Sequence, residues 1–329
     1  MLTKNLPVKV IIQFSIVPIS IAILWSSAIV SAFYFLDFKW LAIPFLPISL
    51  IGIAVSFYLG FKNNASNERQ NEARKNWGSI TNDSRAFIAL LNTYLPDDTD
   101  EVKVLKSQIL KRHIAWLYAH KSFLRHKRMD WEHNLSINNT YRKRFQKKFN
   151  INLALEKDIK QYISFDEIKE IELSPNIAST LLQNQSTALK QLRTKNLIED
   201  FRLFELQNHI TKLFEHQGKN ERIKTFPIPR QFASYSRLFV NIFMLLLPLG
   251  LLKETQGINL WLTIPFSSLI SWVFFQMELI GEYSEYPFEG LMGDIPITSI
   301  TRNIEIEILY ALGETDIPKP IAAVDGILM

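Results

Sequence analysis

The stretch PISLIGIAVSFYLGFKNNASNERQNEAR, from Pro47 to Arg74, decides how the rest of the chain is organised. Its first half is apolar as far as Phe61, and its second half is polar and charged. Together with the residues just before it, the apolar half is long enough to cross a bilayer as a helix. We therefore predict one continuous helix whose apolar part lies in a membrane and whose polar part continues into water.

Bulky apolar residues recur on one face of this predicted helix. Ile53, Phe57 and Phe61 stand four residues apart, so they share a face and span roughly 12 Å of the helix axis. A ladder of small residues runs one position earlier, about 100° around the helix: Gly52, Ser56 and Gly60. Small residues at this interval let helices approach closely in lipid, where no hydrophobic effect drives them together.

A seam of small residues beside a bulky stripe suits a ring of identical helices around an axis. In such a ring the seam meets the neighbouring helix, and the bulky side chains point inward as stacked hydrophobic collars. The alternative is an ordinary contact between two helices, with the aromatic side chains facing lipid. The spacing alone leaves both arrangements open.

The composition excludes some classes of site and partner. The hydrophobic fraction of 47% is ordinary for a soluble protein, but it averages over very apolar and very polar blocks. The chain has no cysteine, so it contains no disulfide and no thiolate metal or redox site. Its net charge of +5 comes from basic residues scattered among acidic ones, a pattern that does not indicate a nucleic-acid partner.

Four apolar blocks predict a multi-pass membrane protein: Val10 to Leu36, Leu41 to Phe61, Leu238 to Leu252 and Ile258 to Ile280. The first block is uncharged and too long for a signal-peptide core, so we interpret it as a retained membrane helix. The third block is short for a span, and Phe226 to Phe232 could supply the missing length.

The polar region between the second and third blocks has helical periodicity and no run that alternates as strands do. It holds most of the lysine and arginine, which favours a cytosolic location for it and for both ends of the chain. The predicted fold class is all-α. The predicted parts are 1–61 with the first two membrane helices, 62–230 as a cytosolic helical domain, 231–281 with the third and fourth membrane helices, and 282–329 as a cytosolic tail.

Four histidines recur at six- or seven-residue intervals: His113, His120, His126 and His133. They lack the usual pair four residues apart with a carboxylate partner, and lysine and arginine crowd the same strip. We therefore interpret them as a solvated or subunit-contact face rather than a metal site. The sequence also lacks a glycine-rich phosphate loop, a serine elbow and a paired-carboxylate motif, so it predicts neither an enzyme nor a cofactor.

Several longer motifs carry a resemblance to a known family. They are LGFKNNASNERQNEARKNWG (Leu59 to Gly78), NDSR (Asn82 to Arg85), FPIPRQ (Phe226 to Gln231), LLLP (Leu245 to Pro248) and GEYSEYPFEGLMGDIPIT (Gly281 to Thr298). In this order, and over nearly the whole chain, they resemble the signatures of bacterial bestrophins. Bestrophins are pentameric ion channels that mostly conduct anions, although some bacterial members favour cations.

The resemblance implies a homopentamer in the lipid bilayer of the inner membrane, passing monovalent ions such as chloride. It implies that Ile53, Phe57 and Phe61 form the hydrophobic neck of the pore. The family has a second, cytosolic constriction, and alignment backward from Pro229 puts Phe201 at that position. The alternative is that this phenylalanine packs among its neighbours Leu197, Phe204 and Leu206.

Glu68 and Glu72 continue the face of the collars below Phe61. In a pentamer they would form acidic rings under the neck, and such rings favour cations. The alternative is that they pair with nearby cations and carry no selectivity; the candidates are Lys62, Arg69 and Arg74.

Calcium-gated animal bestrophins carry an acidic clasp directly after the PF turn. At the matching positions this chain has Glu289, Gly290, Leu291, Met292 and Gly293, and only Asp294 is retained. Because a calcium site needs six or more oxygen ligands, we predict no metal ligand here.

A second class of function is a membrane-anchored helical scaffold or sensor that does not conduct ions. A scaffold has no need of three bulky residues in register beside a small-residue seam. The mass of the detergent-solubilised particle separates the two classes, because a monomer or dimer would favour the scaffold.

Overall fold

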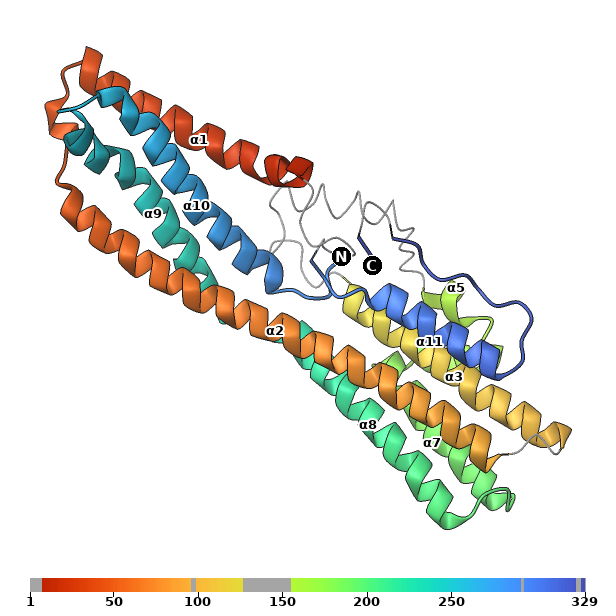
Figure 1. Ribbon diagram of the computed structural model, residues 1–329. Coiled ribbons are helices and arrows are strands. Elements are labelled where there is room, and N and C mark those ends of the chain that lie inside the picture. Colours follow the sequence, from red (N-terminus) through yellow and green to blue (C-terminus); the bar gives the residue numbers. More distant parts are fainter. Residues whose placement is uncertain (1–7, 96–98, 127–154, 291–292, 324–326, 329) are drawn as a thin grey trace. The chain divides into compact units, whose positions relative to one another are not determined.

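The computed structural model describes residues 8–95, 99–126, 155–290, 293–323 and 327–328. All the regular secondary-structure elements of these residues are helices (Figure 1), which confirms the predicted all-α fold class. The α-helices are α1 (Val8–Phe35), α2 (Phe45–Tyr94), α3 (Asp100–Arg125), α5 (Leu155–Ile159), α6 (Phe165–Glu172), α7 (Ile177–Thr194), α8 (Asp200–Thr225), α9 (Arg230–Thr255), α10 (Thr263–Ser284) and α11 (Ile297–Ala311), with short 3-10 turns η1 (Lys39–Leu41) and η2 (Leu260–Leu262).

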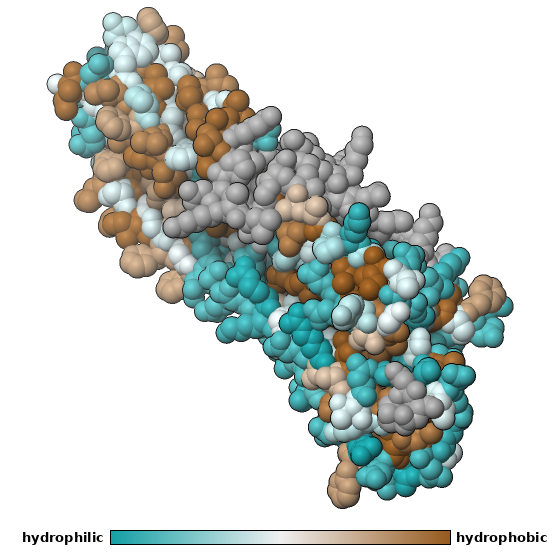
Figure 2. Space-filling model, turned by 45° about the vertical axis from the view of Figure 1, so that its right-hand side comes forward, coloured by the Kyte–Doolittle hydropathy of each residue, from teal (hydrophilic) through white to brown (hydrophobic). Residues whose placement is uncertain are grey.

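The described chain forms two compact units. We call Thr3–Gln70 with Pro227–Tyr286 the apolar unit, and Asn71–Phe226 with Pro287–Met329 the polar unit. Apolar side chains dominate the visible surface of the first, and hydrophilic side chains that of the second (Figure 2). The fourfold division at 61, 230 and 281 concerns membrane topology and stays a prediction.

In the part of the chain that the structure describes, four helical segments are long and apolar enough to span a membrane: Ile11–Phe35, Lys39–Tyr94, Arg230–Thr255 and Leu260–Ser284. Each overlaps one of the predicted apolar blocks, and the chain is a membrane protein. The third block looked short because its apolar core is only part of α9, which begins at Arg230 and has 26 residues.

Within the apolar unit, α1 packs against α9 and α10, and α9 packs against α10. The apolar part of α2 joins this bundle through a cluster of buried residues that α2 shares with α9: Ile48, Val55, Leu59, Val240, Phe243 and Leu247. Glycine allows close approach at a second point, because a Cβ added to Gly250 would lie 2.5 Å from the Ile48 side chain. The α2–α9 contact therefore lies on one side of α2 and leaves its other side uncovered.

The polar unit is built around α3, which contacts α5, α7, α8 and α11. Trp116 of α3 is 1% exposed, and its Nε1 donates to Oε1 of the buried Gln217 at 2.9 Å. Three helices of this unit begin beside a residue whose side-chain oxygen accepts a hydrogen bond from the first turn: Thr99, Ser164 and Asn176. Such caps satisfy backbone N–H groups that have no partner inside the helix.

Candidate ion pathway

The three predicted neck residues lie on the face of α2 that the chain's own helices leave uncovered. Ile53 is 55% exposed, Phe57 67% and Phe61 68%. On the opposite face, Val55 and Leu59 are buried against α9. More than half of each residue of the bulky ladder is therefore available to line a pore or to face lipid. Its role as a neck stays a prediction.

The ladder of small residues is divided between two environments. A Cβ added to Gly52 would lie 2.7 Å from Cε2 of Phe243, so Gly52 serves the close contact with α9 of the same chain. Ser56 is part-buried, and its hydroxyl donates to the Gly52 carbonyl at 2.8 Å. A Cβ added to Gly60 would meet no heavy atom within 4 Å. The seam between subunits stays a prediction, and Gly60 is the member with room for a neighbouring helix.

The two acidic residues below the collars differ in their partners. Glu68 is exposed and accepts a hydrogen bond from Asn64 Nδ2 at 3.0 Å, one turn earlier in α2. Glu72, in the polar unit, forms an ion pair with Arg222 of α8. Sequence reasoning missed Arg222 because it lies 150 residues away and only the packing of α8 on α2 brings it close.

Two of the three cations that the sequence offered as partners for these acids have contacts with α10 or the residue after it. Lys62 is buried and pairs with Glu278 of α10, with Nζ 2.5 Å from Oε1. Arg69 donates from Nε to the Glu285 carbonyl at 3.2 Å. The charge of Glu68 is thus not offset by Lys62, although the two residues are close in sequence.

Phe201, the predicted cytosolic constriction, is the second residue of α8 and is 86% exposed. It is therefore not packed among its sequence neighbours; Leu206 is fully buried, and Phe204 is 66% exposed. An exposed ring at the start of a helix is free to meet a neighbouring subunit or a pore. Its role as a constriction stays a prediction.

The turn after Phe288 is held by cations of the chain itself. Arg125, at the end of α3, lies 3.3 Å from Asp294 and donates to the carbonyls of Phe288 and Ile295 at 3.1 Å each. Burial lowers the pKa of the Arg125 guanidinium, and Asp294 opposes that shift. Glu289, the other acidic residue of the turn, is buried and accepts from Lys224.

The conformation of this turn also requires glycine. Gly290 has a φ of +78°, and its N–H donates to Asp294 Oδ2 at 2.6 Å. Leu291 and Met292 lie outside the described residues. Within those residues, no group of three or more histidine or acidic side chains could hold a metal ion.

A comparison with sequence models of protein families decides which family the chain belongs to. The sequence model described as "Bacterial/Fungal Bestrophin protein" matches residues 6–310. The chain belongs to the bacterial and fungal bestrophin family. This membership confirms the family suggested by the sequence motifs, and with it the prediction of an ion channel.

Individual relatives of this bestrophin agree with that assignment. A voltage-dependent anion channel-forming protein of Escherichia coli (strain K12) is 26% identical over 275 residues, which cover 84% of this chain and 79% of the relative. A protein of the same description from Mesorhizobium japonicum is 25% identical over 95% of this chain and 91% of its own length. The crystal structure of a bacterial bestrophin homolog from Klebsiella pneumoniae shares the fold, with a TM-score of 0.77 at 23% identity, covering 91% of this chain and 98% of that one.

Two of the four recurring histidines of this bestrophin lie in the core, so the prediction of a solvated or subunit-contact face is wrong for them. His113 is 1% exposed, and His120 is fully buried. Their seven-residue spacing places both on the face of α3 that packs inward. His126 is exposed, and His133 lies outside the described residues.

Burial determines the charge state of these two histidines. His113 Nε2 lies 2.9 Å from Ser84 Oγ, and His120 Nε2 lies 3.1 Å from Asn220 Nδ2. The ring of His120 also stacks between Trp77 and Trp116. Burial lowers the pKa of each imidazole to about 3, so both are neutral at physiological pH.

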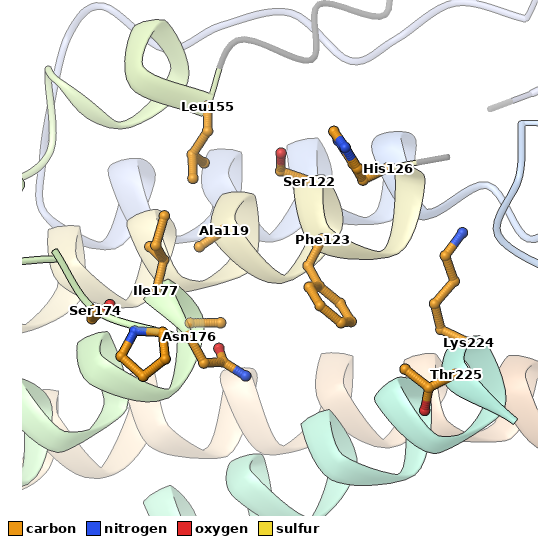
Figure 3. A pocket seen from close by; sticks show the side chains of 12 residues that line it. Ala119, Ser122, Phe123, His126, Leu155, Ser174, Asn176, Ile177, Lys224 and Thr225 are labelled. Atoms are coloured by element: carbon orange, nitrogen blue, oxygen red, sulfur yellow. The ribbon is translucent and has the colours of Figure 1, made fainter. Parts of the chain in front are cut away.

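The polar unit of this bestrophin also contains a cavity of about 460 Å³ (Figure 3). It lies where the end of α3, the start of α7 and the end of α8 meet. Phe123 and Ile177 contribute apolar surface, and Lys224 at its edge is paired with Glu289. Among the described residues that line it there is no carboxylate, so these offer no paired acid and base.

Proposed function

We propose that this chain assembles as a homopentamer around a central pore in the inner membrane and passes small monovalent ions, chloride among them. The observation that carries the proposal is the exposed ladder of Ile53, Phe57 and Phe61 on the free face of α2. In a family of ion channels, an exposed apolar ladder on the second membrane helix is best used as the lining of a narrow neck. Both ends of the chain lie in the cytosol in this arrangement, in line with the basic character of the polar region.

The neck controls passage by its apolar surface and its width. A narrow apolar tube excludes water, so ions pass only when it widens or when its lining becomes less apolar. Aromatic rings add an orientation effect, because their edges are partially positive and their faces partially negative. The tilt of Phe57 and Phe61 therefore influences which sign of charge passes more easily. Phe201 provides a second apolar constriction at the cytosolic exit.

Selectivity is set by the charges near this path. The relatives described above are named as anion channel-forming proteins, which supports chloride as a permeant ion. A ring of Glu68 carboxylates below the neck raises the local cation concentration and so weakens the preference for anions. Glu72 contributes less, because Arg222 offsets its charge. Both carboxylates act less strongly at high salt, which screens charges across a wide vestibule.

The first experiment tests assembly and conduction together. We expect the purified protein to have the mass of a pentamer in detergent and to release chloride from liposomes. Changing Ile53, Phe57 and Phe61 together to alanine should keep that mass and raise both conductance and open probability. A parent particle that is a monomer or dimer and releases no chloride would support the scaffold instead.

The second experiment tests selectivity with a matched pair of variants. Glu68→Gln should move the reversal potential under a salt gradient toward the anion side, and Glu72→Gln should move it less. The two variants remove the same charge from positions one turn apart on α2, and Glu72 is the one that is paired with Arg222 in the parent. Equal shifts, or no shift for Glu68→Gln, would contradict the proposed role of Glu68.

A further inference from the structure

Three helices of the apolar unit meet at a buried polar node directly behind the predicted neck. Lys62 of α2 extends toward α10, where its Nζ lies 2.5 Å from Glu278 Oε1. Ser236 of α9 donates to the other oxygen of the same carboxylate, also at 2.5 Å. All three residues are at most 5% exposed. The node joins α2, α9 and α10 at one level of the bundle.

Stability alone does not account for an ion pair at this place. Removing two charges from water is costly, and well-packed apolar residues of similar volume stabilise a protein as well or better. Glu278 lies within the fourth predicted apolar block, Ile258 to Ile280. Ionisable side chains inside membrane segments are expensive, and they usually mark a functional element. What an ion pair adds over an apolar contact is direction, since its hydrogen bonds fix the rotation and the axial position of the helices that carry it.

Position along α2 connects this node to the neck. Lys62 directly follows Phe61, and successive residues of an α-helix are about 100° apart. Holding the Lys62 side chain on the α10 side therefore keeps the Phe61 ring on the exposed face, where it is 68% accessible. A small rotation of α2 that loosened the ion pair would swing the last collar of the predicted neck.

Two further contacts fix the axial position of α2 relative to α10. A Cβ added to Gly281, three residues after Glu278, would collide with Oδ1 of Asn63. Seven residues beyond the ion pair on both helices, Arg69 donates to the Glu285 carbonyl. Contacts that recur at equal spacing on two helices resist sliding as well as rotation. The polar part of the α2–α10 contact therefore covers about two turns of each helix.

From this geometry we infer that Lys62, Glu278 and Ser236 act as a clamp that positions Phe61 and so sets how readily the neck opens. The three are positioning residues and do not line the ion path, because each is buried inside the unit. The inference rests on the proposed channel function. It assigns control of the gate to contacts inside each subunit, behind the collar residues themselves.

Ser236→Ala is the most informative single change. It removes one hydrogen bond to Glu278 and leaves the ion pair and the chain's charge intact. A hydrogen bond to a charged group contributes enough to change an equilibrium about tenfold. In single-channel recordings from planar bilayers, open probability should change by about this factor, while unit conductance and reversal potential stay at the parent's values. Ser49→Ala is the matched control, since the Ser49 hydroxyl donates to the Leu46 carbonyl of its own helix.

A charge exchange gives an independent test with rescue. Lys62→Glu and Glu278→Lys should each alter open probability strongly or prevent assembly, because each places two like charges in the node. The double exchange restores an ion pair, and the Ser236 hydroxyl can accept from the relocated lysine. Open probability of the double variant should return toward that of the parent.

The results separate the clamp from the channel function. A parent protein that does not conduct overturns the proposed function. If the parent conducts, but Ser236→Ala keeps the parental open probability and the double exchange behaves no better than the single ones, the clamp is wrong and the channel stands. A change in reversal potential with Ser236→Ala would also contradict the clamp, because it would place the node in the ion path.

Discussion

His120 of α3 provides a test of the polar core that does not depend on conduction. Its imidazole is fully buried between Trp77 and Trp116, and burial lowers its pKa to about 3. In the unfolded chain the same group has its ordinary pKa of 6.5. Above pH 6.5 the imidazole is neutral in both states and has no effect on the pH dependence. As the pH falls from 6.5 toward 3, only the unfolded chain binds the proton, so the free energy of unfolding decreases.

The size of the effect follows from the difference in proton binding. A pH of 5 is about 1.5 units below the pKa of the imidazole in the unfolded chain, which corresponds to roughly 2 kcal/mol of lost stability. His113 contributes a similar amount, because its pKa is lowered in the same way. Together the two histidines account for about 4 kcal/mol of acid sensitivity between pH 7.5 and pH 5.

The assay compares parent and variant at two pH values. The free energy of unfolding of the detergent-solubilised protein is measured by denaturant titration at pH 7.5 and pH 5.0, with tryptophan fluorescence as the signal. His120→Gln should lower the free energy of unfolding at pH 7.5, because the stacking of the imidazole on Trp77 and Trp116 is lost. It should also reduce the loss of stability on acidification by about 2 kcal/mol. His126→Gln, at an exposed position, is the control. If His120→Gln keeps the parent's full loss on acidification, the imidazole takes up a proton in the folded protein and is not buried as described.

Three further predictions concern other parts of the chain. Gly60→Leu should break up the oligomer and leave the subunit folded. Gly52→Leu should instead destabilise the subunit itself by about 1–3 kcal/mol, because the Phe243 side chain must move. Equal particle masses for the parent and Gly60→Leu would refute the seam between subunits. Phe201→Ala should raise unit conductance at unchanged particle mass, and an unchanged current would place the exit constriction elsewhere. Asp294→Asn leaves Arg125 buried without its carboxylate and should lower the free energy of unfolding by about 3–5 kcal/mol, as measured by denaturant titration; a loss below 1 kcal/mol would show that this ion pair does not hold the turn.

The sequence alone determined the membrane helices and the all-α architecture. Apolar blocks of this length follow from the thickness of a bilayer, and the helical periodicity of the polar region follows from local geometry. The same periodicity placed Ile53, Phe57 and Phe61 on one face of α2, and all three are exposed on that face. These properties depend on residues close in sequence, so they can be predicted without knowledge of the tertiary structure.

Only the tertiary structure decided which faces and charges meet. Periodicity put His113 and His120 on one face of α3, but it could not say that this face was the inner one, because lysine and arginine crowd the same strip of sequence. Lys62 pairs with Glu278, a residue 216 positions away, and Arg222 pairs with Glu72, 150 positions away. Gly52 belongs to a ladder by its spacing, yet it is used against Phe243 of the same chain. Such contacts depend on which helices pack together, and that choice is made by the free energy of the whole bundle rather than by any local stretch.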